Sequence, residues 1–175
     1  IVQNPQTGQP LAQMNPAAFG PAWFVKGIKY VANGKEEMKA LDSTNLRDTA
    51  VVQTKFKSFI TEPVADSTAS IRLIENRNDI IHYESSAASN QFAVFSEIYY
   101  TAGWNAFIDG KKAEIVKTNY ALRGLAVPAG KHKIEFRFEP KSYELGDTLN
   151  LISSILVYLI VLGGLFMTWK TSKQS

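Results

Sequence analysis

The sequence contains no cysteine and only two histidines among its 175 residues. The absence of cysteine excludes disulfides, thiolate zinc sites and cysteine nucleophiles. His82 and His132 stand far apart in the chain and outside any HExxH spacing, so the sequence predicts no metal site. It also lacks a phosphate-binding glycine loop and a nucleophile elbow. We therefore predict no cofactor and no catalytic residue in this chain.

The chain also has no strong excess of positive or negative charge, because its formal net charge is only +3. Basic and acidic residues alternate, as in Lys133, Glu135 and Arg137, which is typical of a solvated surface and not of a nucleic-acid interface. Glu36 and Glu37 are neighbours on a predicted helix and therefore point in different directions. We expect both of them to be solvated, and we expect no nucleic acid among the partners.

The chain begins at Ile1 and shows neither a basic segment nor an apolar run of the kind that exports proteins. We expect it to be a fragment whose export elements lie upstream. Residues 1–21 are rich in Pro, Gln, Asn and Gly without periodicity, which predicts an extended lead-in or linker.

Residues 22–146 show the pattern of a β-rich domain. Two short segments flank Asp109-Gly110, a sequence that favours a type I′ hairpin. Ile134, Phe136 and Phe138 alternate with charged residues, as in a half-buried strand. We predict an antiparallel β-sandwich, jelly-roll or Ig-like, with one short helix at 34–41. The expected strands are 23–31, 50–54, 70–74, 80–83, 91–100, 104–108, 113–117, 120–127 and 132–138.

One long apolar run is present, near the C-terminus. Residues 149–169 read LNLISSILVYLIVLGGLFMTW and carry no charge, which is long enough for a helix to cross a hydrocarbon core about 30 Å thick. We predict a single transmembrane helix at 147–170 and a cytoplasmic tail at 171–175. Lys170 and Lys173 follow the run, so the positive-inside rule places the main domain outside the cytoplasm.

Aromatic and polar residues gather in the second half of the predicted domain. Aromatic faces beside hydrogen-bonding side chains can hold sugars, and Tyr100, Asn119, Tyr120 and Arg123 are the candidates for such contacts. Trp104 is expected to be a structural anchor of the hairpin that follows it. The alternative is that Trp104 and Tyr120 are core residues of the sandwich and Arg123 is a structural partner.

Around these residues the chain resembles the YfhO family of bacterial multi-span membrane proteins. The matching segments are SEIYYTAGWNAFIDG (96–110), NYALRGLAVPAGKHKIEFRFEPKSYELGD (119–147), NPAAFGPAWFVKGIKYVANGKEEMKAL (15–41) and DTAVV (48–52). Thr101 stands where the family pattern suggests a proline, a departure that concerns only the conformation of that turn.

This resemblance implies a polytopic protein similar to GT-C glycosyltransferases, which use lipid-linked sugars to modify cell-envelope polymers. The catalytic carboxylates of that architecture lie on loops that this chain does not contain. We expect an accessory extracytoplasmic domain in the bacterial cytoplasmic membrane. Its expected partners are membrane lipid, upstream transmembrane helices of the same protein, and a glycan or lipid-linked sugar. A structural cap of the membrane helices and a membrane-anchored glycan-binding module are the alternatives.

Overall fold

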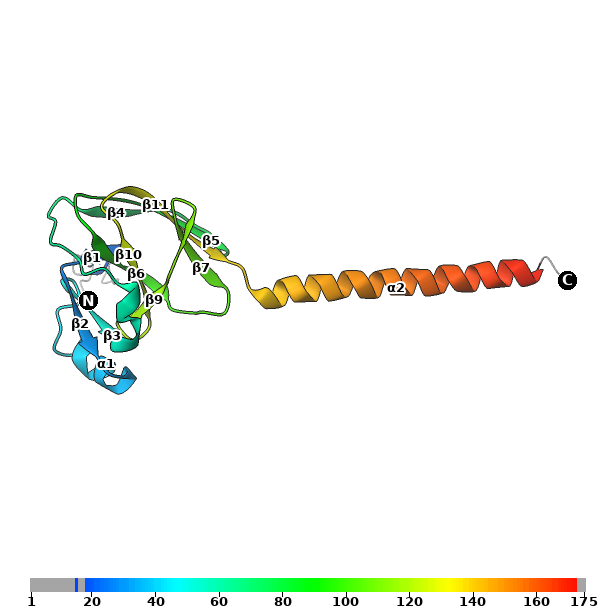
Figure 1. Cartoon of the computed structure of the whole chain (residues 1–175), viewed down its shortest axis with the longest axis horizontal. Helices are drawn as coiled ribbons and strands as arrows, with labels where there is room; N and C mark the ends of the chain where they lie inside the picture. Colours follow the sequence, from blue (N-terminus) through cyan, green and yellow to red (C-terminus); the bar gives the residue numbers. More distant parts are fainter. Residues whose placement is uncertain (1–14, 16–17, 173–175) are drawn as a thin grey trace, which may run out of the picture.

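The computed structural model of the chain describes residue 15 and residues 18–172. Most of the predicted lead-in, and residues 173–175 of the predicted tail, lie outside this range. The described chain forms a mainly β domain of two sheets, followed by one long helix (Figure 1).

The first sheet has six strands in the order β1-β6-β10-β9-β3-β2. β1 and β2 are separated by Lys26 alone, yet they lie at opposite edges of this sheet. The sheet must therefore curl strongly. Its strands are β1 (Ala22–Val25), β2 (Gly27–Val31), β3 (Thr49–Gln53), β6 (Gln91–Ile98), β9 (Val116–Thr118) and β10 (Leu122–Val127).

The second sheet has five antiparallel strands in the order β4-β5-β11-β7-β8. In β11, Ile134 and Phe136 are buried while Lys133 is exposed, which confirms the predicted alternation. The strands are β4 (Ser70–Asn76), β5 (Ile80–Ala87), β7 (Trp104–Ile108), β8 (Lys111–Ala113) and β11 (Gly130–Phe138).

The main core lies between the two sheets. Phe95 of β6 contacts Tyr83 of β5 and Phe136 of β11, with 4.9 Å between ring centroids in both pairs. A second core lies inside the curl of the first sheet and includes Val52 and Phe92. Because successive residues of β6 face opposite cores, the strand is apolar on both sides.

Four features of the predicted fold are wrong. β2 pairs with β3 in parallel, so the fold is not purely antiparallel. The predicted strand 23–31 is divided at Lys26, where the chain passes between the edges of the curled sheet. The predicted strand 113–117 is divided as well, since β8 and β9 belong to different sheets. Besides α1 (Gly34–Leu41), a second short helix, the 3-10 helix η1 (Thr54–Phe59), is present.

Two turns have positive φ at both central residues. Asp109 (φ 50°) and Gly110 (φ 78°) connect β7 to β8, as the predicted type I′ hairpin requires. Asn119 (φ 47°) and Tyr120 (φ 69°), followed by Ala121, connect β9 to β10 in a three-residue loop. The prediction that Tyr120 begins a strand is wrong, because β10 starts at Leu122 and Tyr120 has the left-handed conformation that an aromatic residue rarely adopts.

The last helix, α2 (Lys141–Ser172), projects alone from the β domain (Figure 1). It begins directly after Pro140, six residues before the predicted start of the membrane segment. Within the part of the chain that the structure describes, no helix is long and apolar enough to cross a membrane, so the predicted span is not confirmed.

Candidate functional site

A shallow pocket of about 160 Å³ lies between the loop that follows β6 and the β7–β8 hairpin. It is smaller than pockets that enclose drug-sized ligands. Tyr100 is 54% exposed at its edge. The complete lining consists of Tyr99, Tyr100, Thr101, Trp104, Asn105, Ala106, Lys112, Ala113, Glu114 and Ile115.

The pocket combines aromatic rings with both kinds of charge. The exposed side chains of Lys112 and Glu114 flank the rings of Tyr99 and Trp104. Burial, and then the nearby carboxylate of Glu114, raise the pKa of Tyr99, so this hydroxyl remains a hydrogen-bond donor near neutral pH. Such a set can stack against a sugar ring and bind its hydroxyl groups.

Backbone contacts fix the floor of the pocket. Glu139 N donates to Gly103 O at 2.7 Å, and the side chain of Asn105 donates to the Glu139 carboxylate at 2.9 Å. Gly103 has φ 142°, and a Cβ there would lie 2.6 Å from the Phe138 ring. A glycine is therefore required before Trp104, whose ring packs 5.3 Å from that of Phe138.

Arg123 lies behind Trp104, inside the domain. Only 3% of it is exposed, so it cannot meet a ligand at the surface as the sequence suggested. Its guanidinium stacks 4.3 Å from the centre of the Trp104 ring, and its Nε donates to Ile98 O at 2.9 Å. Arg123 thus supports the pocket wall from within, which is the alternative that the sequence left open.

The charge of Arg123 is poorly compensated where it lies. Its Nη1 and the hydroxyl of Tyr83 are buried without hydrogen-bond partners among the described residues. Burial lowers the pKa of Arg123, opposed by the nearby carboxylate of Glu97. Burial, and then Glu97, raise the pKa of Tyr83 to about 12. A buried, underpaired cation costs stability.

Asn119 and Tyr120 lie in the β9–β10 turn beside α1, and the pocket lining does not include them. Asn119 is buried, and its side-chain oxygen accepts from Val51 N at 2.8 Å. Tyr120 N donates to the carboxylate of Glu37 at 2.8 Å. Both residues hold the turn against β3 and α1, so the predicted cluster of four residues is not formed.

Glu37 is the largest error of the sequence interpretation, because it is fully buried and not solvated. Its carboxylate also accepts from Gln53 Nε2 at 2.7 Å. Glu36, its neighbour, donates its backbone N–H to the N-cap side chain of Asn33 and accepts from Ala32 N, one residue before the cap. The local sequence does not distinguish the two glutamates. Glu37 is buried because the turn that contains Tyr120, far away in the sequence, packs against it.

The two histidines lie outside the pocket. His82 is placed between Glu75 and Glu135, at 3.0 and 3.2 Å, and His132 contacts Asp109 at 2.6 Å. Among the described residues, no group of three potential ligands could hold a metal ion. These contacts link neighbouring strands and turns of the second sheet.

Comparison with known families gives one result. A family model described as "Bacterial membrane protein YfhO" matches residues 38–150, more than half of the chain. The matched range includes the whole lining of the pocket and confirms the resemblance noted in the sequence. Comparisons with curated proteins and with solved structures found no match.

Proposed function

Because the chain belongs to the YfhO family of bacterial membrane proteins, we propose that its β domain is an accessory extracytoplasmic domain of a glycosyltransferase-like protein. That protein uses lipid-linked sugars to modify cell-envelope polymers. The β domain contributes sugar contacts, and the catalytic groups lie elsewhere in the protein.

The exposed apolar surface of α2 supports a membrane location. Residues 149–164 are all exposed along the helix, and several of the large apolar side chains, such as Leu151 and Ile160, exceed 60% exposure. Water is a poor environment for so continuous an apolar surface. Lipid, or other helices of the same protein, cover it in our proposal, and Lys170 and Lys173 remain on the cytoplasmic side.

The single observation that carries the sugar-contact role is the aromatic pocket itself. The exposed Tyr100 ring stands beside Trp104 and close to the charged groups of Lys112 and Glu114. A ring face and donors within one small pocket suit a single sugar unit. Of the residues predicted from the sequence, Tyr100 remains the proposed contact, and Trp104 forms the wall behind it.

A structural cap of the membrane helices is the second candidate. The observation in its favour is that Asn119, Tyr120 and Arg123 all serve the interior of the fold. In that case the pocket is a gap between a loop and a hairpin, and the domain contributes stability alone.

Alanine variants of the pocket separate these two functions. Tyr100→Ala and Lys112→Ala, at two exposed positions of the lining, should in the whole membrane protein lower sugar incorporation into envelope polymer several-fold, with unchanged protein level and melting temperature. Phe59→Ala is a matched control, because Phe59 is 48% exposed and lies outside the pocket lining. Normal incorporation in both pocket variants would favour the structural cap.

A further inference from the structure

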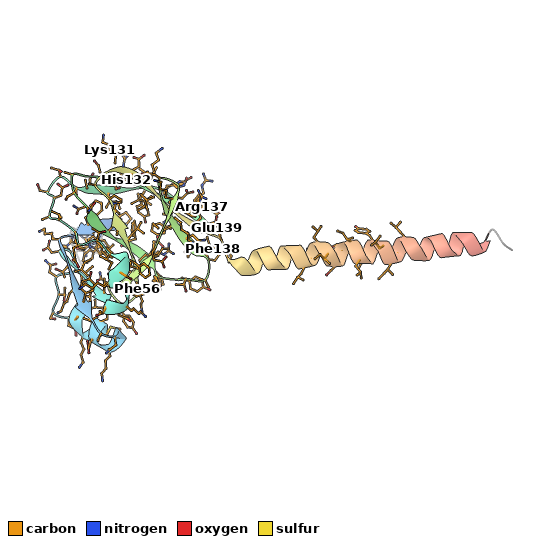
Figure 2. All side chains as sticks on the ribbon, in the orientation of Figure 1. Phe56, Lys131, His132, Arg137, Phe138 and Glu139 are labelled. Carbon is orange, nitrogen blue, oxygen red and sulfur yellow. The ribbon has the colours of Figure 1, made fainter. Side chains whose placement is uncertain are left out.

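The end of the β domain from which α2 leaves is fixed by a short connection. Only Pro140 separates Glu139 from the start of α2 at Lys141, and Glu139 N is bonded to Gly103 O. One residue spans less than about 4 Å, so the loop at 99–103 lies next to the first turn of α2. Figure 2 shows Phe138 and Glu139 beside that helix start, and Lys131 and His132 farther from it.

Large apolar side chains are exposed at this end of the domain. Ile98 is 71% exposed, Tyr100 54% and Phe138 38%. We call these three residues the apolar rim. Arg123 connects two of them, Ile98 and Phe138, because it binds Ile98 O and stacks on Trp104, which packs against Phe138.

The apolar rim is held by ordered contacts. The ring of Phe138 packs against both Gly103 and Trp104, and Tyr99 N donates to Ala121 O at 2.7 Å. A surface fixed in this way cannot hide its apolar groups by folding them inward. It is therefore preformed for an apolar or amphipathic partner.

We propose that the apolar rim lies in the headgroup region of the same membrane that holds α2. This inference rests on the proposed membrane location of that helix. Aromatic residues prefer the membrane interface, where the ring is partly apolar and a hydroxyl such as that of Tyr100 stays hydrated. Bilayer lipid is the occupant favoured here, since only residues 141–146, about 9 Å of helix, separate the rim from the predicted membrane segment.

The position of the rim specifies the substrate class of the pocket. Tyr100 belongs to both the rim and the pocket lining, so the pocket opens at the level of the lipid headgroups. A sugar attached to a lipid is held at that level, whereas a sugar far along an envelope polymer is not. The pocket is thus placed for the lipid-linked sugar.

Labelling at single cysteines tests this inference, because the chain has no cysteine of its own. The whole chain is labelled with the fluorophore NBD at Ile98→Cys, Leu156→Cys or Ala129→Cys and reconstituted into vesicles of phosphatidylethanolamine and phosphatidylglycerol. Ala129 is exposed in the turn before β11, at the strand end opposite α2, and is the matched control. Quenching by lipids that carry a nitroxide in the headgroup or in the chain reports depth.

The expected result is that headgroup nitroxides quench Ile98 strongly, acyl-chain nitroxides quench Leu156, and Ala129 is unaffected. If Leu156 is quenched and Ile98 behaves as Ala129 does, the rim proposal is overturned and the membrane location of α2 stands. If Leu156 is not quenched, the membrane location itself fails and the rim proposal falls with it. If Ile98 becomes shielded without lipid quenching, the rim binds a second copy of the chain, which also overturns the proposal.

Discussion

Glu37 shows how one buried carboxylate can join three separate elements. It lies on α1, accepts from Gln53 at the end of β3, and accepts from the backbone of Tyr120 in the β9–β10 turn. That turn is strained, because a tyrosine at φ 69° is unfavourable. The Glu37 bond therefore helps to hold a conformation that the local sequence would avoid.

Replacing Glu37 tests this role. Glu37→Ala should lower the free energy of unfolding by about 2–4 kcal/mol, because two donors lose their partner in a buried place. Glu37→Gln keeps one acceptor oxygen and should cost less. Urea unfolding followed by tryptophan fluorescence measures both variants. Equal stability of Glu37→Ala and the parent would show that water replaces the carboxylate and that the turn holds itself.

Two variants of Arg123 separate the contribution of its packing to stability from the contribution of its charge. Arg123→Ala removes the group that fills the space between Trp104 and Phe136, and should cost about 2–4 kcal/mol. Arg123→Met keeps most of the volume and removes an underpaired buried cation, so its cost should be below about 1 kcal/mol. The same unfolding measurement applies. If the methionine variant is as unstable as the alanine variant, the charge itself stabilises the fold, through Glu97 or through the Ile98 carbonyl.

At the scale of elements, His132 joins two turns. Its Nδ1 contacts the Asp109 carboxylate in the β7–β8 turn, and its Nε2 lies 3.1 Å from Ala129 O before β11. The hydrogen bond with Asp109 raises the pKa of His132 above 6.5 and, in return, lowers the pKa of Asp109 below 3.8. The contact is therefore strongest when His132 is charged and Asp109 is ionised.

The melting temperature should depend on pH accordingly. A raised histidine pKa gives a contribution that is complete below pH 6.5 and is lost as the pH rises through the folded pKa. The lowered pKa of Asp109 gives a contribution to stability that is complete above pH 3.8 and is lost as the pH falls through the folded pKa. The parent should thus lose stability as the pH rises above 6.5 and through the raised pKa of His132. Asp109→Asn, which tolerates the positive φ of the turn, should lose less over that range, as should His132→Gln. Parallel pH curves for all three proteins would exclude this pair as the origin.

The elements that the sequence predicted correctly are those that a few neighbouring residues determine. The alternation in β11 and the Asp109-Gly110 turn need only neighbouring residues to be recognised. The break at Lys26 and the change of sheet after Ala113 depend on which distant strands lie alongside. Only part of the pocket was predicted. Tyr100 and Trp104 are close in sequence and were both identified, whereas Lys112 and Glu114 reach the pocket only through the β7–β8 hairpin and were missed.

At the scale of the whole molecule, the two sheets enclose apolar cores, whereas α2 exposes its apolar side chains. The β domain packs many of its large apolar side chains, such as Tyr83, Phe95 and Phe136, in cores between and inside its sheets. α2 exposes apolar side chains along residues 149–164 and leaves the domain beside the apolar rim. Both exposed apolar surfaces thus lie on the same side of the molecule, where one membrane can cover them together.

The orientation of that membrane is open to a direct test in bacterial spheroplasts. Single cysteines are placed at Ser67, which is exposed in the β domain, and at Ser175, and a membrane-impermeant thiol reagent is added. If α2 crosses the membrane with Lys170 and Lys173 inside, Ser67→Cys reacts at once and Ser175→Cys reacts only after permeabilisation. The reverse pattern would place the β domain in the cytoplasm, away from extracytoplasmic sugar donors, and would remove the basis of the proposed function. Immediate reaction at both positions would show that α2 lies along the membrane without crossing it. The apolar rim could then still contact lipid, but the prediction that residues 171–175 lie in the cytoplasm would be wrong.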